Sequence, residues 1–139
     1  MASLSVEKLS KRFGTSFAVD SLELAVCEGE LVALLGPSGC GKTTTLRMVA
    51  GFLPPTSGRV LFDNEDVTAL PAHKRSTGMV FQSYALFPHM TAAQNVGFGL
   101  EMRGLGGVER SARVEEAMKL VRLSDLANRL PRELSGGQQ

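Results

Sequence analysis

The chain has 139 residues, of which 43% are hydrophobic and 21% charged, as in an ordinary globular protein. This length suits one modest domain. The net charge of +1 gives no electrostatic support for a polyanionic partner, so we expect no nucleic-acid binding.

Membrane spans and metal sites are not indicated either. No apolar run approaches the roughly 20 residues of a membrane span, and the first residues lack the apolar core of a signal peptide. We therefore expect a cytoplasmic protein unless a partner holds it at a membrane. Cys27 and Cys40 do not suggest a disulfide framework. His73 and His89 stand apart without ligand-like neighbours, so a zinc-type site is not expected.

Several segments of the first half read as strands. Alternation of apolar and polar residues indicates half-buried strands at 4–9 and 22–26, with a turn at 11–14. The continuous apolar run 31–35 is typical of a buried parallel strand. Further strands are expected at 59–63 and 77–82. The pattern predicts a small antiparallel β layer that leads into a parallel core.

Residues 36–43, Gly-Pro-Ser-Gly-Cys-Gly-Lys-Thr, match the phosphate-binding pattern G-x-x-x-x-G-K-[ST] at every defined position. Glycines let several N–H groups point into one concavity at a helix N-terminus, which favours an anion. Lys42 brings a positive charge to the β- and γ-phosphates, and Thr43 offers a hydroxyl to Mg²⁺. The predicted nucleotide-binding residues are Gly36, Pro37, Ser38, Gly39, Cys40, Gly41, Lys42, Thr43 and Thr44.

The motif leads to two further predictions, one about Cys40 and one about the helix that follows. Cys40 is interpreted as a filler whose backbone N–H contacts phosphate, with a reactive thiol as the alternative. A helix is expected from Lys42 to Ala50, where apolar residues recur at helical spacing.

The second half is expected to be helical. Thr91 is the expected N-cap of a helix that runs to about Met102, although glycines interrupt it. Residues 109–123 form the clearest helical pattern, which we interpret as a half-buried packing helix. Its apolar face consists of Val114, Ala117, Met118 and Val121.

The segment Leu-Ser-Gly-Gly-Gln at 134–138 decides the class, because it follows the phosphate-binding motif in the same chain. With it, the whole chain resembles the nucleotide-binding subunit of ABC transporters. Residues 36–43 match the Walker A motif, Gln82 matches the Q-loop glutamine, and 134–138 match the LSGGQ signature. Phe13 falls where the family has an adenine-stacking aromatic residue, commonly tyrosine.

The resemblance implies an α/β fold. It would have a P-loop NTPase core, an N-terminal antiparallel β layer and an α-helical subdomain, truncated after the signature motif. The implied division is a β layer and Walker A core at 1–82, and a Q-loop and helical subdomain at 83–139.

The resemblance also implies an ATPase with ATP and Mg²⁺ as cofactors. Lys42 and Gln82 would be catalytic, and Thr43 and Gln82 would ligate the metal. The signature would close over the γ-phosphate of ATP bound to a second subunit, in a head-to-tail dimer. The signature residues are Leu134, Ser135, Gly136, Gly137 and Gln138.

In the family, the stretch 84–90 lies where a transmembrane permease contacts the ATPase. The apolar residues Tyr84, Leu86, Phe87 and Met90 suit such a contact, or they pack internally. This resemblance places the protein on the cytoplasmic face of the inner membrane, held there by the permease. The sequence around Gln82 looks most like importers of the spermidine/putrescine, ferric iron, sulfate and maltose group.

In the family, the Walker B aspartate, the catalytic glutamate, the D-loop and the switch histidine follow the signature, and these 139 residues contain none of them. We therefore expect the 139 residues alone to bind nucleotide weakly, without steady turnover. Two alternatives stay open. One is a non-transport ABC-family ATPase, and the other is a truncated nucleotide-binding module without turnover.

Overall fold

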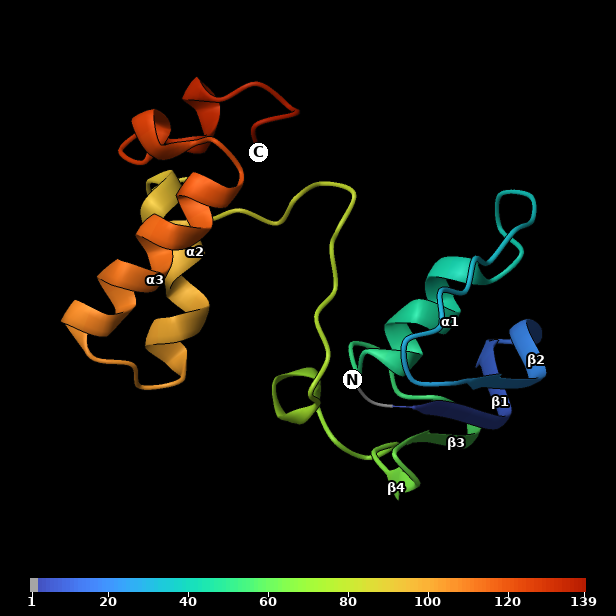
Figure 1. Ribbon diagram of the computed structural model, residues 1–139. Coiled ribbons are helices and arrows are strands. Elements are labelled where there is room, and N and C mark those ends of the chain that lie inside the picture. The colour runs from blue at the N-terminus through green and yellow to red at the C-terminus, as the bar shows by residue number, and fades with distance from the viewer. Residues whose placement is uncertain (1–2) are drawn as a thin grey trace. The chain divides into compact units, whose positions relative to one another are not determined.

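A computed structural model describes residues 3–139. The chain forms two compact units, with the boundary in the sequence between Met79 and Val80 (Figure 1). The first unit contains a β-sheet and one α-helix, α1. The second contains two α-helices, α2 and α3, with short 3₁₀ turns. The boundary between the two units lies inside the segment 77–82.

The sheet of the first unit has four antiparallel strands in the order β2-β1-β3-β4. They are β1 (Leu4–Phe13), β2 (Ser16–Val26), β3 (Ser57–Phe62) and β4 (Glu65–Asp66). The predicted antiparallel layer is confirmed, and its strands are longer than the alternation alone indicated.

A tight turn at Gly14 and Thr15 joins β1 to β2, so the turn expected at 11–14 is wrong in its first three residues. Arg12 and Phe13 remain in β1, where Phe13 lies opposite Ser16. Gly14 has a φ of 58°, a left-handed value that glycine adopts without steric cost. Cross-strand pairing therefore extends the strand through residues whose composition suggests a turn.

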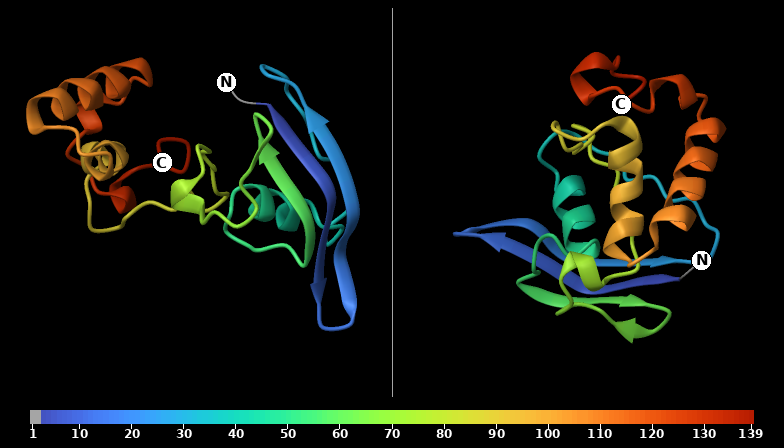
Figure 2. Two further views of the ribbon diagram at one scale, coloured as in Figure 1. Left: turned by 90° about the horizontal axis from the view of Figure 1, so that it is seen from below. Right: turned by 90° about the vertical axis from the view of Figure 1, so that its left-hand side faces the viewer.

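Helix α1 (Lys42–Val49) packs against one face of this sheet (Figure 2). The core between them consists of Val6, Leu9, Met48, Val60 and Val67. The helix ends close to the predicted residue, with Ala50 as C-cap. Gly51, at a φ of 80°, and the bond from the Phe52 N–H to the Arg47 carbonyl complete a Schellman motif. Burial of Met48 thus fixes the helix against the sheet.

The predicted parallel strands at 31–35 and 77–82 are wrong, because neither segment is a strand. Leu31 is 96% exposed and Val80 is 95% exposed. An apolar run becomes a buried strand only where neighbouring strands take its backbone hydrogen bonds. Within residues 3–139 no strand pairs with either run. The parallel part of the expected core is therefore not formed among the described residues.

In the second unit, α2 (Ala92–Met102) and α3 (Gly107–Leu120) pack together. Thr91 caps α2 as predicted. Its hydroxyl accepts from the Gln94 N–H, and the Gln94 side chain accepts from the Thr91 N–H, which is a capping box. The 3₁₀ turns are η1 (Ala72–Lys74) in the first unit, and η2 (Ser124–Leu126) and η3 (Pro131–Glu133) in the second.

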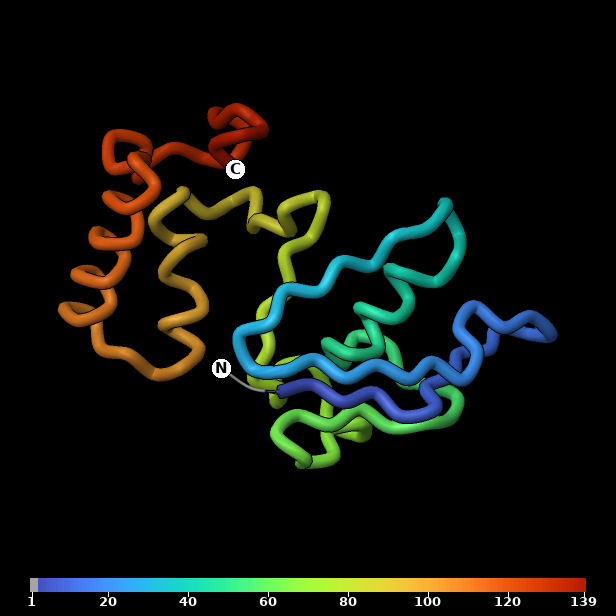
Figure 3. Tube along the Cα trace, turned by 45° about the vertical axis from the view of Figure 1, so that its right-hand side comes forward, coloured from blue at the N-terminus to red at the C-terminus, as the bar shows by residue number. Residues whose placement is uncertain are grey.

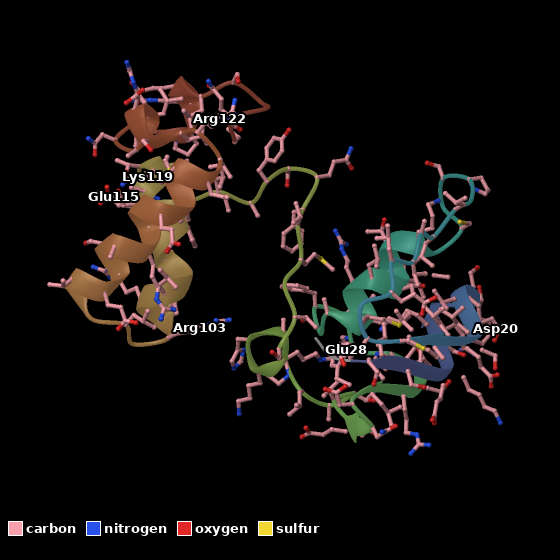
Figure 4. All side chains as sticks on the ribbon, in the orientation of Figure 1. Asp20, Glu28, Arg103, Glu115, Lys119 and Arg122 are labelled. Atoms are coloured by element: carbon pink, nitrogen blue, oxygen red, sulfur yellow. The ribbon has the colours of Figure 1, made fainter. Side chains whose placement is uncertain are left out.

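Helix α3 is shifted relative to the predicted 109–123. Val114 and Met118 of the predicted apolar face are buried, whereas Val121 is 59% exposed and lies beyond the helix end. Glu115 and Lys119, labelled in Figure 4, form an ion pair of 2.6 Å on the exposed side. Exposed pairs of this kind contribute little stability.

The two glycines inside α2 are expected to respond differently to alanine. A Cβ at Gly99 meets nothing within 4 Å, so Gly99→Ala should raise the free energy of unfolding by about 0.5–1 kcal/mol. A Cβ at Gly97 would lie 3.2 Å from Cγ2 of Val114, so Gly97→Ala should give less or none of that gain. Urea unfolding of both variants checks this. An equal gain at both positions would contradict the close packing of α2 on α3.

No helix within residues 3–139 is long and apolar enough to cross a membrane. In the same stretch, no group of three or more His, Cys, Asp and Glu residues is placed to hold a metal ion. Cys27 and Cys40 are both exposed free thiols.

Candidate nucleotide-binding site

The segment 36–43 consists of a loop at 36–41 and the first two residues of α1 (Figure 3). Its glycines all have positive φ: 154° at Gly36, 84° at Gly39 and 95° at Gly41. L-residues rarely adopt these values, so the loop requires glycine at each position. The loop is thus curled as a phosphate-binding loop must be.

Gly41 is also required by a close contact with the sheet. A Cβ at this position would overlap the carbonyl oxygen of Ala18 and lie 3.1 Å from Cγ2 of Val19, both in β2. The absence of a side chain therefore lets the last turn of the loop rest directly on β2. This contact and the burial of Met48 hold the loop and the helix on one rigid support.

The N-terminus of α1 is electropositive. The Thr45 N–H donates to the Gly41 carbonyl at 2.8 Å, and the N–H groups before it have no intrahelical acceptor. No acidic residue lies in the first turn and no side chain caps it. The helix dipole and these N–H groups together favour an anion. Thr43 and Thr44 lie in this turn, and Thr43 is exposed.

The ammonium of Lys42 lies inside the loop. Its Nζ donates at 2.6 Å to the carbonyls of both Gly36 and Pro37, and it lies 3.4 Å from Sγ of Cys40. The lysine therefore closes the loop on itself and places a full positive charge beside the helix N-terminus. Cys40 is exposed beside it as a free thiol.

The opposite end of α1 is held by Arg75. The side chain is buried, with the residue only 6% exposed. Its guanidinium donates to the carbonyls of Met48 and Val49 at the end of α1, and to those of Leu70 and Thr68. Burial lowers the pKa of Arg75 from its usual value, although guanidinium stays protonated in proteins. Arg75 thus neutralises the negative end of the helix dipole.

Phe13 lies at the end of the hairpin whose second strand supports the loop. It is 54% exposed, and Nζ of Lys11 lies 5.4 Å from the centre of its ring. Because Gly41 rests on β2 at Ala18, close to the hairpin turn, Phe13 and the loop belong to one assembly. The exposed part of the ring is accessible to a planar group.

The signature segment 134–138 lies in the second unit and forms a capped turn. The Ser135 N–H donates to Oε1 of Gln138 at 2.9 Å, and the Gln138 N–H donates to the Ser135 carbonyl at 2.9 Å. Nε2 of Gln139 donates to the carbonyls of Pro131 and Leu134. Ser135, Gly136 and Gly137 are exposed. The turn has the geometry of a helix start.

Gln82 also lies in the second unit, in an exposed loop. Tyr84 and Ala85 follow it with φ of 62° and 54°, two consecutive left-handed residues that are not glycine. The hydroxyl of Tyr84 lies 3.8 Å from the position of a Cβ at Gly136. The structure therefore brings the loop after Gln82 beside the signature, a contact that no sequence pattern indicated. Gln82 and the signature both lie in the second unit, whereas the 36–43 loop lies in the first.

The glycine loop, the enclosed lysine and the open helix N-terminus define a P-loop domain of the α/β class. The sequence profile of the ABC transporter family matches residues 19–139, and the chain belongs to this family. The predicted fold class and the predicted family are both confirmed.

Two relatives show how close the match is. The chain is 57% identical over 137 residues to the Fe(3+) ions import ATP-binding protein FbpC of Brucella abortus (strain 2308), covering 99% of this chain and 39% of that protein. It is 54% identical over 140 residues to the spermidine/putrescine import ATP-binding protein PotA of Thermobifida fusca, covering 98% and 36%. The chain thus spans well under half of these relatives.

Solved structures of the ATP-binding cassette MJ0796 have the same fold. One is the dimeric post-hydrolysis state bound to ADP and Pi, with 32% sequence identity and a TM-score of 0.86. The match covers 97% of this chain and 64% of that one. A second dimeric structure of MJ0796, a bacterial ABC transporter cassette, matches equally well.

Proposed function

We propose that the chain is the ATP-binding part of an ATPase subunit that powers solute import. The observation that carries this proposal is the position of Lys42, whose ammonium lies inside the glycine loop at the open N-terminus of α1. Phosphate oxygens entering the loop would replace the two carbonyls as acceptors of the Lys42 N–H groups. Both partners in the new bonds carry a charge, so these bonds are stronger than those to the neutral carbonyls.

Catalysis in such a site rests on positioning and on electrostatic stabilisation of the γ-phosphate. Lys42 supplies charge, the loop N–H groups bind oxygens, and Phe13 stacks on the base. The hydroxyl of Thr43 and the side-chain oxygen of Gln82 are hard donors that fit Mg²⁺, and both residues are exposed. Bound Mg²⁺ would neutralise charge on the β- and γ-phosphates, and Gln82 would also hold the attacking water.

We further propose that two copies assemble head to tail, so that the signature of one covers the ATP of the other. The capped turn supports this role, because Gln138 occupies the Ser135 N–H and the N–H groups of Gly136 and Gly137 lie on an exposed turn. In this role, the turn would act as a second anion site on the same chain. The dimers of MJ0796, one of them bound to ADP and Pi, support the arrangement.

Ser135→Ala in the full-length protein tests the dimer. Loss of one hydroxyl donor to phosphate should lower ATP-driven dimerisation and turnover by about tenfold or more. Gel filtration with Mg-ATP and a phosphate-release assay measure these quantities. Ser111→Ala, at another exposed serine of the same unit, is the control. Unchanged dimerisation and turnover in Ser135→Ala would show that the signature hydroxyl has no such role.

The loop 83–90 is the proposed contact with the permease, through which the protein would lie on the cytoplasmic face of the inner membrane. Both readings of its apolar residues find support. Phe87 packs on Phe98 with ring centres 4.6 Å apart, yet it remains 37% exposed, and Tyr84 is 47% exposed. The names of the relatives favour ferric iron or a polyamine as cargo.

Uptake by proteoliposomes that contain the full-length protein with its permease tests the whole proposal. Internal ATP should drive uptake of radiolabelled ferric iron or spermidine, and Lys42→Ala should abolish it. If the protein hydrolyses ATP but drives no uptake of polyamine, ferric iron, sulfate or maltose, a non-transport ATPase is favoured.

A further inference from the structure

One side chain of α2, Asn95, holds the loop that precedes the helix. Its Nδ2 lies within hydrogen-bond distance of three carbonyl oxygens: 3.2 Å from Phe87, 3.1 Å from Met90 and 3.0 Å from Thr91. Its Oδ1 accepts from the Phe87 N–H at 2.8 Å. The amide therefore uses both its donor and its acceptor sides on a single stretch of backbone, residues 87–91.

These bonds are not needed to cap the helix. Thr91 and Gln94 already form the capping box at the N-terminus of α2. Asn95 adds a two-point clasp on Phe87, eight residues earlier in the chain, where it pairs with both the N–H and the carbonyl. Such a clasp fixes the backbone of a loop that has no regular structure of its own.

The clasp fixes the presentation of apolar side chains. The ring of Phe87 packs on Phe98 of α2 and meets His89 edge-on, with ring centres 6.1 Å apart. Towards its start, the same loop contains the left-handed Tyr84 and Ala85. The part nearer α2 is thus held in one shape, and the part nearer Gln82 carries the strained backbone.

We propose that Asn95 is a positioning residue that pre-forms the permease-contacting surface of the loop 83–90. This inference rests on the proposed function, since it assigns the loop to the permease. A surface shaped before binding saves the entropy of ordering it in the complex. Asn95 is not among the residues proposed to bind nucleotide or metal, so its loss should affect coupling to the permease and leave the nucleotide site intact.

Asn95→Asp is the sharpest variant, because it is isosteric. The carboxylate still accepts from the Phe87 N–H, but it cannot donate and it places negative charge against three carbonyl oxygens. Asn128→Asp is the matched control, since Asn128 is exposed in the same unit and the change in charge is identical. Asn95→Ala, which removes the clasp without adding charge, separates loss of the bonds from repulsion.

Two measurements on the full-length protein test the role of Asn95. Hydrogen exchange in residues 83–91 should become about tenfold faster in Asn95→Asp and Asn95→Ala, but not in Asn128→Asp. In the complex purified with its permease, stimulation of ATP turnover by the permease should fall about tenfold. Basal turnover and the KM for ATP should stay within twofold of the unmodified protein.

The outcomes separate the inference from the function on which it rests. Unchanged exchange in both Asn95 variants, or unchanged stimulation despite faster exchange, would overturn the role of Asn95 alone. If basal turnover, ATP affinity and thermal stability all fall in the Asn95 variants, Asn95 has a purely structural role and the inference is wrong. Failure of the unmodified protein to associate with any permease would refute the proposed function and with it the permease role of the loop.

Discussion

Lys42→Ala is expected to lower ATP turnover of the full-length protein by about 10²–10³-fold. The reason is geometric as well as electrostatic. The Lys42 ammonium lies against the Gly36 and Pro37 carbonyls at 2.6 Å, inside the loop that receives phosphate. Alanine removes both the charge and the two bonds that close the loop. A phosphate-release assay at saturating Mg-ATP gives the turnover.

Two comparisons sharpen this test. Lys74→Ala removes an equal charge at an exposed site in the 3₁₀ turn η1, and should leave turnover within twofold. Lys42→Arg retains the charge, but its planar guanidinium does not reproduce the compact ammonium, so turnover should stay low. If the ATP turnover of Lys42→Ala equals that of Lys74→Ala, the loop does not bind phosphate through Lys42.

Arg75→Met is expected to lower the free energy of unfolding by about 2–4 kcal/mol. Methionine can fill the space of the aliphatic stem, but it removes the guanidinium donor from four carbonyl oxygens, of which that of Met48 keeps the Gly51 N–H. Two of those carbonyls, of Met48 and Val49, belong to the last turn of α1. The helix that carries the phosphate-binding loop should therefore fray at its far end. Urea unfolding followed by circular dichroism measures the loss.

Arg59→Met is the matched control for this variant. Arg59 is exposed and pairs with Glu7 at 2.6 Å, so its replacement should change stability by no more than about 0.5 kcal/mol. Arg75→Lys should fall between the two, because one ammonium has three N–H groups for four separated carbonyls. Equal stabilities of Arg75→Met and Arg59→Met would show that the buried guanidinium does not hold α1.

The parts of the fold that could be predicted are those that local physics determines. The glycines in 36–43 predict a tightly curled phosphate-binding loop, and Gly36, Gly39 and Gly41 all have positive φ. The alternation in β1 and β2 predicts an antiparallel pair, and the Thr91 cap predicts the start of α2. Each of these features depends on residues close together in the chain.

The parts that could not be predicted depend on distant partners. The apolar runs at 31–35 and 77–82 predict burial, but a strand needs a neighbour, and none pairs with them within residues 3–139. Arg75 stands in a polar stretch that looks like surface, and only the packing of α1 shows that it is buried. Asn95 shows no pattern at all, because its partners are backbone carbonyls that any residue supplies.

The thiol of Cys40 offers the most direct measurement of the central claim, that the 36–43 loop binds the phosphates of ATP. Cys40 lies in the loop, 3.4 Å from Nζ of Lys42, and Cys27 is a second exposed thiol outside it. The rate of maleimide labelling at each cysteine of the full-length protein should be followed with and without Mg-ATP. We predict at least about tenfold slower labelling of Cys40 and unchanged labelling of Cys27, since the bound nucleotide covers the loop. Equal labelling of Cys40 with and without saturating Mg-ATP would contradict nucleotide binding in this loop.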